Sequence, residues 1–254
     1  EGDEIIVPEP YYSNYNTIAN SCGVVLVPFK TKIEDGFHIK DKDLISKAVT
    51  KKTKAILYSN PSNPTGVVYS LKELELLAEV ALENELFIIS DEVYRELVYD
   101  NIQYKSIFSI EKVRNNLILV DSLSKRYSVC GSRIGMVASK NFELMKEILK
   151  LCQSRLSISS VEQFTAINLL KLPISYIEDV KRNYEERRNE ICSILKKIDG
   201  IELYKPEGAF YLIVSLPIEN AEEFCKWLLT NFNINNETVM FAPAEGFYFD
   251  GEIG

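Results

Sequence analysis

The sequence has 254 residues, of which 46% are hydrophobic and 26% charged, so it can bury a sizeable core and form a large domain beside a smaller one. The net charge of −8, the lack of a basic stripe and the lack of a long uncharged apolar run argue against a nucleic-acid partner and a membrane span. Five scattered cysteines and one histidine, His38, predict reduced thiols in the cytoplasm and no metal site, with His38 exposed in a polar turn.

Short apolar runs alternate with helical patterns along the first two thirds of the chain. The expected strands are 4–7, 24–28, 55–58, 86–90, 117–120 and 134–138, and the expected helices are 14–22, 42–48, 70–84, 142–151 and 161–170. Ser70 and Glu73 form a capping-box pattern that opens one of these helices. This alternation predicts an α/β fold in which helices cover a mostly parallel sheet.

The pattern changes in the last third of the chain. A long charged helix is expected over 173–197. It is followed by expected strands at 201–204, 209–215 and 239–241 and an expected helix at 221–231. Several strands with one covering helix predict a smaller α+β domain. We therefore expect a large domain over residues 1–172 and a small C-terminal domain over residues 173–254.

Polar side chains follow three of the expected strands. The loop NPSNPTG follows the strand 55–58, Asp91 and Tyr94 follow the next strand, and Lys125 follows the strand 117–120. Open α/β sheets bind their ligands at the carboxyl ends of parallel strands. A lysine that is desolvated there has a lowered pKa and can act as an amine nucleophile. The three strand ends therefore predict one polar site with a reactive lysine.

These stretches resemble the signatures of a known enzyme family. NPSNPTG, SDEVY and SLSK, with Arg133 eight residues beyond Lys125, are similar to those of the fold-type I pyridoxal-phosphate enzymes, specifically the class I/II aminotransferases related to aspartate aminotransferase. The resemblance implies a homodimer that uses pyridoxal 5′-phosphate. It implies transfer of an amino group between an L-amino acid, aspartate-like or aromatic, and a 2-oxo acid by a ping-pong mechanism.

The resemblance also implies roles for individual residues around the cofactor ring. Lys125 would form the Schiff base and carry the proton from the substrate. Asp91 would pair with the pyridine nitrogen, while Asn63 and Tyr94 would donate to the phenolic oxygen. Tyr12 would stack on the ring face, with the adjacent Tyr11 as the competing candidate. Read without the resemblance, Asp91 caps a helical turn and Tyr94 is a core aromatic residue.

Three further residues are implied as phosphate ligands. Arg133 would bind the phosphate with a charge-assisted fork and Ser122 with its hydroxyl, and Ser124 would assist. Pro10 and Pro64 stand where the family often has cis peptide bonds. The cis isomer costs little free energy when the bond precedes a proline.

The sequence departs from the family pattern in places. Ser132 stands where many relatives have a tryptophan, and Cys130 replaces a frequent threonine, so the wall behind Lys125 is expected to be less bulky. The resemblance also implies a glycine- and serine-containing phosphate loop before Glu1 and an arginine for the substrate carboxylate after Gly254. We expect the chain to be truncated at both ends.

Two other functions fit the same motifs. Pyridoxal-phosphate lyases and synthases share the scaffold and differ in the reaction. A non-enzymatic effector-binding domain of a transcription regulator would carry the same fold without turnover. Formation of pyridoxamine phosphate on adding an amino acid would separate transamination from the lyase and synthase reactions, and a basic helix-turn-helix before Glu1 would indicate the regulator.

Overall fold

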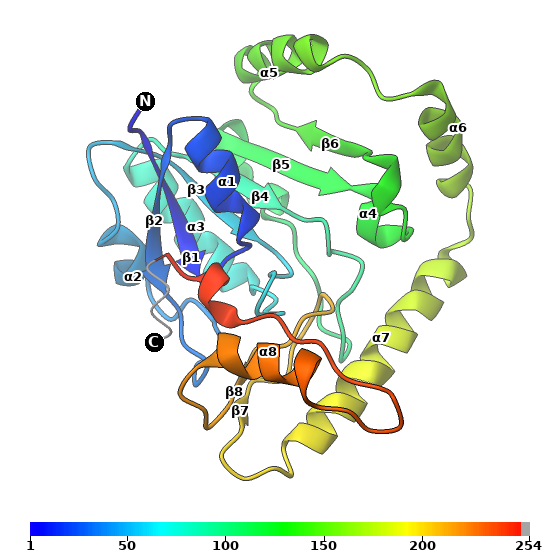
Figure 1. Ribbon diagram of the computed structural model, residues 1–254. Helices are drawn as coiled ribbons and strands as arrows, with labels where there is room; N and C mark the ends of the chain where they lie inside the picture. The colour runs from blue at the N-terminus through cyan, green and yellow to red at the C-terminus, as the bar shows by residue number, and fades with distance from the viewer. Residues whose placement is uncertain (250–254) are drawn as a thin grey trace.

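The computed structural model describes residues 1–249; the predicted end of the small domain, residues 250–254, lies outside the described residues. Its centre is a six-stranded sheet in the order β2-β1-β3-β4-β5-β6 (Figure 1). The strands are β1 (Glu4–Glu9), β2 (Val25–Lys30), β3 (Thr53–Ser59), β4 (Phe87–Asp91), β5 (Leu117–Ser122) and β6 (Gly135–Ala138). Neighbouring strands are parallel except β5 and β6, which are antiparallel. The predicted α/β fold with a mostly parallel sheet is confirmed.

Helices cover both faces of this sheet because successive side chains of a strand point to opposite faces. Ile6 of β1 packs in a core with α3 (Leu71–Glu83), whereas its neighbour Val7 packs in a second core with α1 (Asn14–Ser21). The short helix α2 (Lys42–Ser46) joins the α3 side. The sheet is therefore buried from both sides where the polar strand ends emerge.

The helices after β6 run along the outside of the molecule as an arc (Figure 1). They are α5 (Phe142–Arg155), α6 (Ser160–Leu169) and α7 (Ile174–Leu195). Several of their apolar side chains are exposed, including Phe142 at 78%, Val161 at 72% and Phe164 at 68%. Within residues 1–249, none of the helices is both long and apolar enough to cross a membrane.

The last part of the described chain contains α7, a two-stranded antiparallel sheet, one further helix and a short 3₁₀ helix. These elements are β7 (Glu202–Leu203), β8 (Val214–Ser215), α8 (Ala221–Thr230) and η4 (Ala244–Phe247). The predicted strand at 239–241 is wrong, since these residues have no regular structure. The predicted strand at 209–215 survives only at its end, because Ala209 N–H bonds to Leu97 O of a distant loop instead of a strand neighbour.

Two local predictions in the first part of the chain, the capping box and the cis peptide bonds, are confirmed. The capping box is confirmed, because Ser70 Oγ accepts from Glu73 N–H and Glu73 accepts from Ser70 N–H at 2.8 Å. The expected cis bonds are present before Pro10 and Pro64, and a third precedes Pro61.

The prediction that His38 is an exposed residue is wrong. Its Nδ1 lies 2.9 Å from Glu73 Oε1 and its Nε2 lies 3.5 Å from Glu207 Oε2, and its side chain is only 24% exposed. The hydrogen bonds with Glu207 and Glu73 outweigh burial and raise the pKa of His38 from 6.5 to about 9. His38 therefore joins the start of α3 to the segment that contains Glu207.

We expect this histidine to make the stability of the protein depend on pH. A histidine whose pKa is higher in the folded state stabilises the fold fully below its unfolded pKa of 6.5 and loses that contribution as the pH rises through about 9. Relative to His38→Gln, the free energy of unfolding should fall by about 3 kcal/mol across this interval. Urea unfolding of both proteins at a series of pH values measures it, and parallel pH profiles would contradict it.

Candidate active site

The carboxyl ends of β3 and β4 lie level with each other, and the neighbouring strand β5 continues to Ser122 at the same edge. Ser59 at the end of β3 pairs with Asp91 at the end of β4, which pairs with Val120 of β5. The chain leaves each strand into a polar segment at this edge. The loop after β3 carries Asn63, and the four-residue helix α4 (Leu123–Arg126) after β5 carries Lys125.

A small cavity of about 110 Å³ opens at this edge. Its lining residues come from five separate segments of the chain: Tyr12, Tyr15, Ser59, Asn63, Asp91, Val93, Tyr94, Lys125 and Tyr211. Five of the eight site residues predicted from the sequence are in this set, namely Tyr12, Asn63, Asp91, Tyr94 and Lys125. The fold thus brings a carboxylate, an amine, an amide and several phenols to one place.

Asp91 is a desolvated carboxylate with neutral hydrogen-bond donors. Tyr15 O–H donates to its Oδ2 at 2.9 Å, and Val93 N–H donates to its Oδ1 at 3.2 Å. Burial raises the pKa of Asp91, and these two bonds only partly offset that effect. Asp91 forms no ion pair with any residue in the described range 1–249. A buried carboxylate of this kind favours a cationic partner, such as the protonated nitrogen of a ring in the cavity.

The side-chain amine of Lys125 faces an aromatic ring. Its Nζ is 5.6 Å from the ring centroid of Phe210, and no acidic side chain among the described residues forms an ion pair with it. An amine that faces an aromatic ring and not a carboxylate is not held in a salt bridge. Its nitrogen therefore has the freedom that an amine nucleophile needs.

Asn63 and Tyr94 supply an amide and a phenol to the lining of the cavity. Asn63 is buried, and its side-chain Oδ1 has no hydrogen-bond partner within the part of the chain that the structure describes. Tyr94 is buried too, and burial raises the pKa of its hydroxyl, which keeps it protonated as a donor. Tyr12 is 38% exposed at the mouth of the cavity. An unpaired buried amide beside a neutral phenol suits a ligand with a hydrogen-bonding ring substituent.

The three predicted phosphate ligands do not line this cavity. Ser122 Oγ lies 2.8 Å from both Ser124 Oγ and Ile134 O. Arg133 is exposed, and its guanidinium donates to Cys130 O at 2.8 Å. These hydroxyls and this guanidinium are engaged within their own loop, so their role toward a phosphate stays a prediction.

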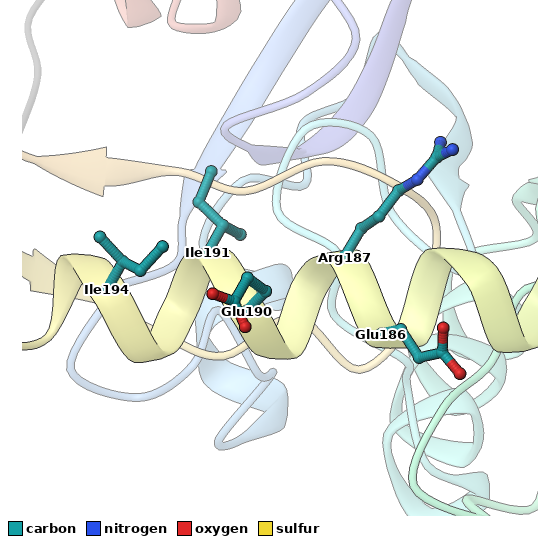
Figure 2. Close-up of a pocket in the computed structure, with 5 residues that line it drawn as sticks. All are labelled: Glu186, Arg187, Glu190, Ile191 and Ile194. Atoms are coloured by element: carbon teal, nitrogen blue, oxygen red, sulfur yellow. The ribbon is translucent and has the colours of Figure 1, made fainter.

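A larger hollow of about 550 Å³ lies elsewhere, against α7 (Figure 2). Its lining residues all belong to that helix: Glu186, Arg187, Glu190, Ile191 and Ile194. Figure 2 shows the two isoleucines on one side of the helix and Glu186 pointing the other way. A surface built from one helix encloses no ligand and brings no catalytic groups together, so the smaller cavity is the candidate active site.

Comparison with known proteins identifies the family. Residues 1–240 match the family model of aminotransferase class I and II. The chain belongs to the class I and II aminotransferases. It is 35% identical over 256 residues to an aspartate aminotransferase of Bacillus sp. (strain YM-2), an alignment that covers 97% of this chain and 64% of that protein. It is 39% identical over 251 residues to a probable aspartate/prephenate aminotransferase of Aquifex aeolicus, covering 97% of this chain and 63% of the relative.

Solved structures of class I and II aminotransferases have the same fold. The aspartate aminotransferase of Thermus thermophilus with maleate superposes with a TM-score of 0.88 at 28% identity, covering 97% of this chain and 63% of that one. An alanine aminotransferase from Pyrococcus furiosus gives a TM-score of 0.88 at 34% identity, covering 98% and 64%. The chain therefore spans just under two thirds of the length of these aminotransferases, a family that depends on pyridoxal phosphate.

Four of the nine residues that line the cavity were not predicted from the sequence, namely Tyr15, Ser59, Val93 and Tyr211. Tyr15 lies in α1 (Asn14–Ser21), whereas Tyr12 precedes that helix, so helical spacing does not place the two side chains on one face. The hydrogen bond to Asp91 shows that Tyr15 faces the site. Tyr211 lies within the expected strand 209–215, so its local pattern predicts a strand residue. Only the tertiary contact with Tyr94 shows that it faces the site.

Proposed function

We propose that this protein is a pyridoxal-phosphate-dependent aminotransferase that moves an amino group from an aspartate-like or aromatic L-amino acid to a 2-oxo acid by a ping-pong cycle. The observation that carries the proposal is the cavity in which Lys125 and Asp91 meet. Family membership supports the cofactor. The names of two relatives, which mention aspartate and prephenate, support the substrate class.

The residues of the cavity fit the cofactor by their chemistry. A desolvated carboxylate without a cation suits the pyridine nitrogen, and the side-chain N–H of Asn63 and the O–H of Tyr94 are donors that suit the phenolic oxygen. Tyr12 would cover the ring face, with Ser122, Ser124 and Arg133 as phosphate ligands. When bound, pyridoxal phosphate supplies an electron sink for the bond that breaks at the substrate Cα.

Three side chains of the protein would hold or move protons during the reaction. The Lys125 amine, displaced by the incoming amino group, would take the proton from the substrate Cα and deliver it to the C4′ atom of the cofactor. Asp91 would keep a proton on the ring nitrogen, because the ion pair compensates the cost of burying the carboxylate. The Tyr94 hydroxyl would hold its proton against the phenolic oxygen. Each role needs only a side chain that already faces the cavity.

We also propose a cytoplasmic homodimer with a large domain over 1–172 and a small one over 173–254. The five cysteines are all free, as expected in a reducing compartment. The exposed apolar side chains of α5 and α6 support association, since exposed apolar patches mark interfaces. Sedimentation equilibrium would contradict the dimer if the purified protein were monomeric at micromolar concentration.

The function is tested by a half-reaction. The protein expressed from its complete gene is loaded with pyridoxal phosphate and mixed with L-aspartate or L-glutamate, without a 2-oxo acid. We expect one pyridoxamine phosphate and one 2-oxo acid per active site, because the cycle stops halfway. Released ammonia without pyridoxamine phosphate would indicate a lyase. An unchanged cofactor would favour an effector-binding domain.

A further inference from the structure

Tyr211 makes the closest polar contact of the cavity. Its hydroxyl oxygen lies 2.5 Å from that of Tyr94, and the two rings meet edge to face at 5.5 Å. Both rings are buried enough that burial raises the pKa of each hydroxyl, so both carry a proton. Two neutral phenols at this distance share one hydrogen bond, in which one donates and the other accepts.

The segment that carries Tyr211 is fixed from several directions. Glu207 N–H and Gly208 N–H both donate to Gly66 O, at 2.9 and 2.8 Å. Ala209 N–H donates to Leu97 O at 2.9 Å. At Gly208 a Cβ atom would lie 2.7 Å from Leu97 O, so the chain passes where only glycine fits. The segment that leads to Tyr211 is therefore held by backbone hydrogen bonds to two other loops of the chain.

Phe210, which precedes Tyr211 in the sequence, packs against the same group of aromatic rings. The ring of Phe210 lies 5.2 Å from that of Tyr94, edge to face, and 5.1 Å from that of Tyr184, stacked. The Lys125 Nζ faces Phe210 from the cavity. Tyr94 packs in a cluster of mostly apolar and aromatic side chains. Among residues 1–249, the Tyr94 hydroxyl forms its hydrogen bond with the Tyr211 hydroxyl.

The direction of this hydrogen bond decides what Tyr94 can do. A phenol has one proton to donate. If Tyr94 donates to Tyr211, it has none for a ligand. If Tyr211 donates to Tyr94, the Tyr94 proton is free to point to the ligand, and the accepted bond makes Tyr94 a stronger donor.

We propose that Tyr211 is a positioning residue that donates to the Tyr94 hydroxyl and thereby commits the Tyr94 proton to the group bound in the cavity. This inference rests on the proposed function, because it takes that group to be the phenolic oxygen of pyridoxal phosphate. A stronger donor there stabilises the oxygen as an anion and lowers the pH at which the bound chromophore loses its remaining proton. Tyr211 thus lets the cofactor-loaded site reach its deprotonated form at a lower pH.

The test uses the visible absorption of the cofactor-loaded protein as a function of pH. Tyr211→Phe removes the hydroxyl and keeps the ring. We expect the pH midpoint of the absorption change to rise by about 0.5–1 unit, the effect of one lost hydrogen bond. Tyr184→Phe is the matched control, because it removes a hydroxyl from the same aromatic cluster, and among residues 1–249 that hydroxyl forms no hydrogen bond with Tyr94. Its midpoint should equal that of the wild type.

A second pair of variants shows whether Tyr211 acts through Tyr94. In a Tyr94→Phe background, Tyr211→Phe should cause no further rise, because the residue that transmits its effect is gone. An additional rise in that background, or a Tyr211→Phe midpoint equal to the wild type, overturns the inference while the proposed function stands. A wild type without any cofactor absorption would overturn the proposed function, and the inference with it.

Discussion

Replacing Lys125 by alanine is expected to slow amino-group transfer by a factor of about 10⁴, because the nucleophile and the proton carrier are lost with one side chain. The structure offers no substitute, since Lys125 is the only lysine among the residues that line the cavity. The rate of pyridoxamine phosphate formation in a single turnover measures the effect. Lys140→Ala is the matched control, because Lys140 is exposed and lies outside the lining.

A covalent readout separates loss of chemistry from loss of folding. Borohydride reduction of the loaded wild type, followed by peptide mass spectrometry, should attach the cofactor to the peptide that contains Lys125. The Lys125→Ala variant should give no modified peptide while keeping the thermal midpoint of the wild type without cofactor. Modification of a different lysine in the wild type would refute the assignment.

The sequence predicts the scaffold well because its physical cause is local. Apolar runs such as Phe87–Asp91 end in polar residues, and a parallel sheet puts those ends on one edge. Asp91 and Lys125 could therefore be placed together before any contact was known. The comparison with the aminotransferase family adds support to the fold, since the same sheet occurs in the solved relatives.

What the sequence could not predict depends on contacts between distant segments. His38 looks like a turn residue in its own neighbourhood, and its buried ion pairs come from α3 and from Glu207. Ala209 sits in an apolar stretch typical of a strand, yet its N–H is taken by a loop. Tyr211 likewise gains its role only when that stretch crosses the cavity. Local pattern carries no information on such partners.

Asp91→Asn is expected to reduce the rate of amino-group transfer by a factor of about 10²–10³, the usual cost of removing one preorganised electrostatic partner from an active site. Asparagine keeps the shape and loses the charge. Its single oxygen can accept from Val93 N–H, while its NH₂ group faces the Tyr15 hydroxyl, which must then accept instead of donate. Glu92→Gln is the matched control. Glu92 is a buried carboxylate next in sequence, but it bonds to Ser90 and Ser106 and lies outside the cavity lining.

The same variant should have the opposite effect on the protein without cofactor. Burial raises the pKa of the Asp91 carboxyl, and a carboxyl with a raised pKa lowers the stability of the fold once the pH is high enough to ionise it. Asp91→Asn removes that cost, so we expect an equal or higher thermal midpoint than the wild type at neutral pH, and a smaller increase on adding pyridoxal phosphate. A lower midpoint without cofactor would mean that Asp91 serves the fold. A higher midpoint together with slower turnover would mean that the carboxylate is retained at a cost in stability because the cofactor needs it.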